Sequence, residues 1–145
     1  MKKIFLGNVG VDSGQLMITD PCYVNDFKSN DFDDVRRYQH KETKDILQYG
    51  KDFIHYEQVI PKYKMTMNEL NAKGIFKTMP RKKIDNSYSY NGACHQTCYD
   101  EKQGGELGRS LGVAFSTHDD GYYSVYGYMN DDNRIMKVEI IMGDE

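Results

Sequence analysis

The chain has 145 residues, of which 39% are hydrophobic and 28% are charged, with three cysteines and no tryptophan. Nineteen basic residues against twenty-two acidic ones give a formal net charge of -3, which does not attract polyanions and argues against general nucleic-acid binding. The length is that of one globular domain with its own hydrophobic core. We therefore expect residues 1–145 to form a single domain.

The sequence contains no apolar run near the roughly 18 residues that a membrane span requires, and its first residues lack the apolar core of a secretion signal. We expect no membrane contact and a cytoplasmic location. The cysteines, Cys22, Cys94 and Cys98, are odd in number, so free thiols are expected rather than disulfides.

The first half begins with two predicted strands, over residues 2–9 and 15–19, joined by a turn rich in Asp, Ser and Gly. Pro21 ends the second strand because it has no N–H to donate. Residues 25–52 are polar and show no strand periodicity, which indicates an insertion or flap. Within it, Asp34 is placed to cap a short helix containing Val35 and Tyr38.

Further predicted elements follow along the chain. Residues 53–60 are expected to form a strand, and Thr66 with Glu69 has the spacing of a capping box that starts a two-turn helix. Residues 87–99 are predicted as another strand. The last third alternates apolar and small or polar residues over 111–116, 122–129 and 134–142, which predicts three consecutive antiparallel strands.

These elements indicate an α+β, β-rich fold. We expect mainly an antiparallel sheet or a partly open barrel of six to seven strands, with a C-terminal three-stranded meander and one or two short helices.

Tyrosine is the most unusual feature of the composition, with twelve residues, many of them in the second half. Strand alternation puts Tyr122, Tyr126 and Tyr128 on one face, where flat rings can stack a nucleobase. Guanidinium groups suit phosphate. The predicted ligand-binding set is Arg109, Tyr90, Tyr122, Tyr126, Tyr128, Arg81 and Asp20.

This pattern predicts a non-catalytic binding protein that takes or sequesters a small polar, nucleotide-like ligand, needs no cofactor and forms a homo-oligomer. Two alternatives remain open. In the first, Cys22, Asp20 and a histidine such as His95 make a thiol-dependent hydrolase or transferase. In the second, an exposed aromatic patch makes the protein an inhibitor that binds a host enzyme.

A metal site is not expected. Cys94 and Cys98 flank His95, but on a predicted strand the two thiols would lie about 13 Å apart, too far to share one zinc ion.

Three motifs occur together in this chain: Ser-Gly-Gln-Leu, then three residues and Asp-Pro-Cys-Tyr, over 13–23; Tyr-Asn-Gly-Ala-Cys over 90–94; and Gly-Val-Ala-Phe-Ser-Thr followed by Asp-Gly-Tyr over 112–122. In these motifs the chain resembles a group of small, mostly uncharacterised bacterial and phage proteins. His118 and Asp119 stand where that group has a glycine-rich pair. The resemblance implies a β-rich intracellular domain of phage or prophage origin, working in the host cytoplasm. It implies no particular chemistry, but a binding protein of that origin would act by sequestering a host signalling nucleotide.

Overall fold

The computed structural model describes residues 1–145 except 35, 81–82 and 144–145. It divides the chain into two compact units, one built from Met1–Asn30 and Ile84–Glu145 and the other from Asp31–Lys83. The second unit is therefore inserted in the first, and it extends well beyond the polar segment 25–52 that the sequence marks as an insertion.

The predicted class is confirmed, since the fold is α+β and β-rich with antiparallel sheets. Among the described residues the strands form four separate sheets rather than one sheet or a barrel. None of the helices in these ranges has the length and apolarity that crossing a membrane requires.

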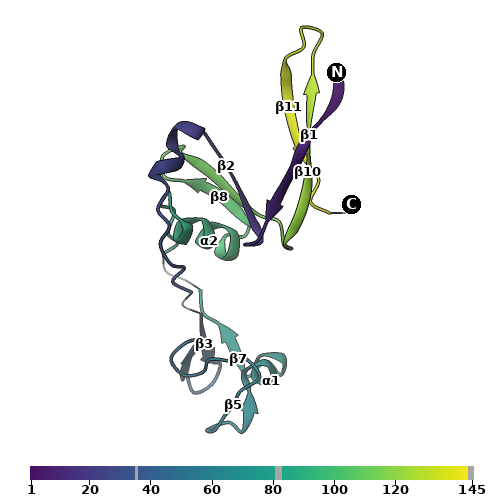
Figure 1. Cartoon of the computed structure of the whole chain (residues 1–145). Coiled ribbons are helices and arrows are strands. Elements are labelled where there is room, and N and C mark those ends of the chain that lie inside the picture. The colour runs from purple at the N-terminus through teal and green to yellow at the C-terminus, as the bar shows by residue number, and fades with distance from the viewer. Residues whose placement is uncertain (35, 81–82, 144–145) are drawn as a thin grey trace. The chain divides into compact units, whose positions relative to one another are not determined.

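The first unit contains two three-stranded antiparallel sheets. One has the order β1-β10-β11, and the other has the order β2-β9-β8 (Figure 1). Their strands are β1 (Lys2–Val11), β10 (Gly121–Met129) and β11 (Ile135–Ile140), and β2 (Gln15–Thr19), β9 (Gly112–Ser116) and β8 (Gly104–Leu107).

The predicted C-terminal meander is wrong in its pairing. β9 pairs with β2 and β8, whereas β10 pairs with β1 and β11, so the chain changes sheet between Ser116 and Gly121. The connection is held away from a hairpin because the Thr117 N–H donates to the Gly14 carbonyl and the Gly14 N–H donates to Asp120. His118 in this loop has φ of 70°, which suits a corner rather than a continuing strand.

Two helical segments complete the first unit. The 3-10 helix η1 (Pro21–Asp26) follows β2, and the helix α2 (Tyr90–Tyr99) lies against the β2-β9-β8 sheet (Figure 1). The sheet and helix enclose a small core of Tyr88, Ala93, Leu107 and Ala114, with Met17, Phe27 and Leu111 packed around it.

The strand predicted over 87–99 is wrong, because residues 90–99 form α2. Ser89 caps the helix by accepting the Gly92 N–H at 2.9 Å. The helix buries polar side chains, among them Asn91, His95 and Gln96, and each bonds with the segment at Asp85. A helix with a polar buried face has no apolar period of 3.6, so the sequence gives no helical signal there.

The second unit is a small α+β module with an aromatic core. It contains β3 (Arg37–His40), β4 (Ile46–Gln48) and β7 (Phe76–Thr78) in one sheet, and β5 (Val59–Ile60), β6 (Met65–Thr66) and the helix α1 (Met67–Ala72). Its core is Tyr38, Phe53, Ile60, Met67, Leu70 and Phe76. The hydroxyls of Tyr38 and Tyr56 bond at 2.8 Å.

Two local predictions fail here and one is confirmed. The short helix expected from Asp34 is instead strand β3, and Val35 lies outside the described residues. Only Val59–Ile60 of the predicted strand 53–60 lies in a named strand, whereas Phe53 makes an isolated bridge with Tyr49 and its ring is buried in the core. The capping box is confirmed: Thr66 Oγ1 accepts the Glu69 N–H at 3.1 Å, and Glu69 accepts the Thr66 N–H at 3.2 Å.

Gly92 is the glycine whose substitution we expect to cost most in the first unit. A Cβ at this position would lie 2.0 Å from the Ser87 carbonyl oxygen, which is backbone and cannot move aside without shifting the cap of α2. Gly92→Ala should lower the free energy of unfolding by about 1–3 kcal/mol, the usual cost of overpacking, in a urea titration. Gly143→Ala is the control, because a Cβ there meets nothing within 4 Å. Equal stability of the two variants would contradict this close approach.

Candidate functional site

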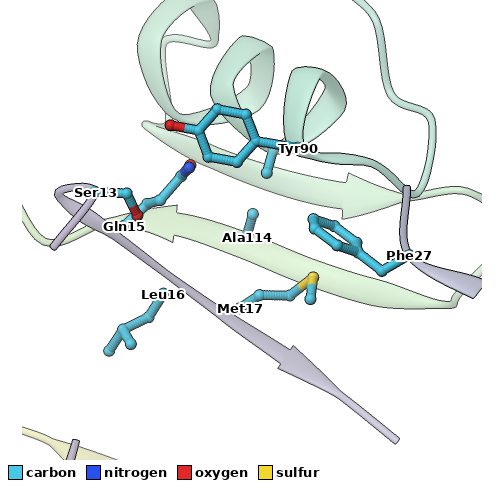
Figure 2. A pocket seen from close by; sticks show the side chains of 8 residues that line it. Ser13, Gln15, Leu16, Met17, Phe27, Tyr90 and Ala114 are labelled. Atoms are coloured by element: carbon cyan, nitrogen blue, oxygen red, sulfur yellow. The ribbon is translucent and has the colours of Figure 1, made fainter. Parts of the chain in front are cut away.

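A pocket opens between β2, α2 and Phe27 in the first unit (Figure 2). Its cavity volume is about 190 Å³, below the roughly 300–1,000 Å³ of sites for drug-sized ligands. Residues from four segments line it: Ser13, Gln15, Leu16, Met17, Phe27, Tyr90, Ala93 and Ala114. None of these described lining residues carries a charge.

Strand alternation explains why β2 supplies this wall. Gln15 and Met17 are two residues apart and point to the same face, toward Ala114 and α2, whereas Leu16 points away in Figure 2. Met17 pairs directly with Ala114 of β9. Because the Ala114 side chain is small, space remains above the sheet at this position, and Ala114 forms the floor of the pocket.

Two aromatic rings form the pocket walls. Phe27 packs edge-to-face on Tyr88, with ring centroids 5.2 Å apart. Tyr90 begins α2, and 38% of its surface is exposed, so its ring remains accessible from solvent. Both rings are held through Lys28, whose N–H donates to the Tyr88 carbonyl at 3.2 Å and whose carbonyl accepts the Tyr90 N–H at 2.8 Å.

A fixed set of neutral polar groups lies beside the rings. The Thr97 hydroxyl donates to Gln15 Oε1 at 3.0 Å, and Gln15 Nε2 donates to Cys94 Sγ at 3.6 Å. The Tyr90 hydroxyl also donates to Cys94, and this hydrogen bond raises the pKa of Tyr90. The amide of Gln15 is therefore oriented by two partners, which prepares it for directional hydrogen bonding.

The predicted ligand-binding residues are distributed over several places. Tyr90 lies in the pocket. Tyr122, Tyr126 and Tyr128 lie on β10, in the other sheet of this unit. Arg81 lies outside the described residues.

The remaining two predicted residues lie at the opposite end of β2 from Gln15. Asp20 caps η1 by accepting the Cys22 N–H at 2.9 Å, and it borders a second hollow that Ser110 also lines. Arg109 precedes Ser110 in the turn between β8 and β9. The structure thus does not bring the seven predicted residues to one site.

The predicted tyrosine face is consistent with the strand register. Tyr126 pairs with Phe5, and Tyr128 pairs with Lys3 and Lys137, on the same face of the sheet. Lys3 Nζ lies 4.4 Å from the Tyr126 ring centroid, and Lys137 Nζ lies 4.4 Å from that of Tyr128. Both lysines are also close to Glu139, which offsets their charge.

The residues of the thiol alternative occupy separate roles. Cys22 is exposed on η1, and within the described residues its thiol has no histidine partner. His95 is buried on α2, and its Nδ1 accepts the Asp85 N–H at 2.8 Å, so this nitrogen is not available as a base. The arrangement supplies no nucleophile and base pair at Cys22.

Cys94 and Cys98 lie one helical turn apart on α2, so the strand geometry used to separate them is wrong. The described residues contain no group of three or more His, Cys, Asp or Glu side chains that could hold a metal ion.

Several pocket residues escaped the sequence analysis. Gln15 and Met17 belong to the Ser-Gly-Gln-Leu motif and its following strand, and their alternation was a usable signal. Phe27 stands in a polar segment, and only the pairing of Lys28 with Ser89 reveals its place.

Comparisons of the chain with protein-family models, with curated proteins and with solved structures each found no match.

The three thiols should react at different rates under native conditions. Cys94 is 5% exposed and accepts hydrogen bonds from Gln15 and Tyr90, whereas Cys22 and Cys98 are exposed. We expect iodoacetamide to modify Cys94 more than about tenfold more slowly than the other two, as followed by peptide mass spectrometry. Equal rates in the native protein, with equal rates in urea as the reference, would contradict the burial of the Cys94 thiol.

Proposed function

We propose that this protein is a non-catalytic binding protein whose pocket, walled by Tyr90 and Phe27, takes the flat heteroaromatic part of a nucleoside-like ligand. The observation that carries the proposal is the pairing of two aromatic walls with an oriented, uncharged amide at Gln15. Aromatic rings stack on a base, and an amide offers both a donor and an acceptor to its edge.

The described lining residues of the pocket carry no charge, and this favours entry of the base of a nucleotide rather than its phosphate. A buried phosphate without a cation is strongly unfavourable, whereas a neutral base loses little on leaving water when its polar edge finds partners. The base would therefore lie in the pocket and any phosphate would remain in solvent. On this proposal the base would carry the recognition, and not the Arg109 and Arg81 contacts expected from the sequence.

The family resemblance and its implied phage origin are consistent with such a role, since a small binder can lower the free concentration of a host signalling nucleotide. Two of the three motifs that carry the resemblance include pocket residues, namely Gln15 in the first and Tyr90 in the second.

Nucleoside binding is tested by calorimetry with the four ribonucleosides and their 5′-monophosphates. At least one nucleoside should bind, and its monophosphate should bind with an affinity within about threefold, because the phosphate makes no buried contact. Tyr90→Ala and Phe27→Ala should each weaken binding about tenfold or more through loss of stacking.

Tyr122→Ala is the matched control, since Tyr122 is 85% exposed on β10 and lies outside the pocket. Its affinity should equal that of the unaltered protein. The proposal would be abandoned if none of the eight compounds bound at millimolar concentration, or if Tyr122→Ala weakened binding as much as Tyr90→Ala.

A further inference from the structure

The inserted unit is basic although the whole chain is acidic. Its sequence, Asp31–Lys83, holds twelve Lys and Arg residues against eight Asp and Glu residues, a net charge of +4. The remainder of the chain holds seven basic and fourteen acidic residues, a net charge of -7. We propose that the inserted unit binds the phosphate backbone of a nucleic-acid duplex through one face of its three-stranded sheet. The total of -3 conceals this asymmetry, which is typical of chains with a local site for polyanions.

The strand register defines the face, because residues paired directly across strands point to the same side of a sheet. Arg37 is paired with Gln48, and Gln39 is paired with both Ile46 and Lys77. The surface formed by these five residues is here called the outer face. The residues that alternate with them belong to the aromatic core or pack against it, namely Tyr38, Leu47 and Phe76.

The outer face carries positive charge without a carboxylate. None of its five residues is acidic, and within the described ranges neither Arg37 nor Lys77 takes part in an ion pair. Lys77 is exposed, and Arg37 is half-buried. The two are diagonal neighbours on paired strands, which puts their Cα atoms about 7–8 Å apart. Both cations can therefore contact one short segment of a phosphate backbone.

The acidic residues of the inserted unit do not compensate these two cations. Asp34 pairs with Arg36, and Asp45 pairs with Lys62, so each of these carboxylates offsets a different cation. Glu69 is held in the capping box of α1. The positive charge of the outer face thus remains available to an anion from outside the chain.

Neutral donors on the outer face suit phosphate diesters. Gln39 lies between the two cations in the register, and Gln48 is paired with Arg37. Gln39 Nε2 donates one hydrogen bond, to the Lys44 carbonyl at 3.4 Å, and an amide nitrogen has two donors. Nucleic-acid phosphates accept hydrogen bonds from Arg and Lys and also from Gln side chains.

The composition of the outer face favours a nucleic-acid duplex over other anionic partners. A duplex presents one negative charge per roughly 1.7 Å of its axis. None of the five face residues is aromatic, so the face has no ring on which an unpaired base of a single strand could stack. Ile46 is the one large apolar side chain among them, whereas binding to an anionic membrane requires a broad apolar surface. Contacts to the backbone alone predict binding without sequence preference.

Fluorescence anisotropy of the full chain with a labelled DNA duplex of about 20 base pairs, and with an RNA duplex of the same sequence, tests the inference. At least one duplex should bind, and the logarithm of its association constant should fall with that of the salt concentration with a slope of about -2, as two phosphate contacts predict. Lys77→Gln and Arg37→Gln should each weaken binding about fivefold at low salt and reduce the slope by about one. Two variants are used, each checked by circular dichroism, so that a folding defect in one does not decide the result.

Lys64→Gln is the matched control, because Lys64 is an exposed lysine of the same unit in the turn between β5 and β6, outside the outer face. Its affinity should stay within about twofold of the unaltered protein, since a charge that touches no phosphate acts only through a screened field. Tyr90→Ala should bind the duplex like the unaltered protein, which separates this inference from nucleoside binding.

Three results would overturn the inference. The first is that neither duplex binds at low salt with about 100 μM protein, the affinity range of non-specific contacts. The second is that Lys64→Gln weakens binding as much as Lys77→Gln, which would assign the effect to net charge. The third is that polyglutamate, or vesicles of phosphatidylcholine with phosphatidylserine, binds as tightly as either duplex.

Discussion

Two backbone hydrogen bonds of Lys28 determine the functional geometry of this protein. They join Lys28 to Tyr88 and Tyr90 just where the chain leaves the first unit at Asn30 and after it returns at Ile84. Because of this junction, 53 residues of inserted chain do not separate Phe27 from Tyr90 in space. The hydroxyls of Tyr88 and Thr19, 2.6 Å apart, then tie the same junction to β2.

The rest of the pocket follows from that junction. With α2 started at Ser89 and docked on the sheet, Gln15 and Met17 face the helix and the small Ala114 leaves space beneath the rings. The same first unit also carries a sheet with two different faces. One presents tyrosines with lysines against them, and the other carries aliphatic side chains, of which Leu6 and Val138 are exposed.

The sequence predicted elements well where local chemistry decides structure. Thr66 and Glu69 form the capping box, and the alternation of Tyr126 and Tyr128 matches the observed register. The predictions from sequence failed where contacts between residues far apart in the chain determine the local structure. The α2 helix buries Asn91, His95 and Gln96 against a loop, so no apolar period marks it. β9 and β10 look like a hairpin, but each finds its partners elsewhere in the chain.

The central claim is that a base lies between Tyr90 and Phe27, and isotope-filtered nuclear Overhauser spectroscopy tests it most directly. A nucleoside without label is added to ¹³C-labelled protein, and contacts from the base protons to side chains are recorded. The account predicts contacts to the Phe27 and Tyr90 rings and to the Met17 methyl group, which lines the same pocket. Contacts to Tyr126 and Tyr128 on β10 instead, or no contact to any of these rings, would contradict it.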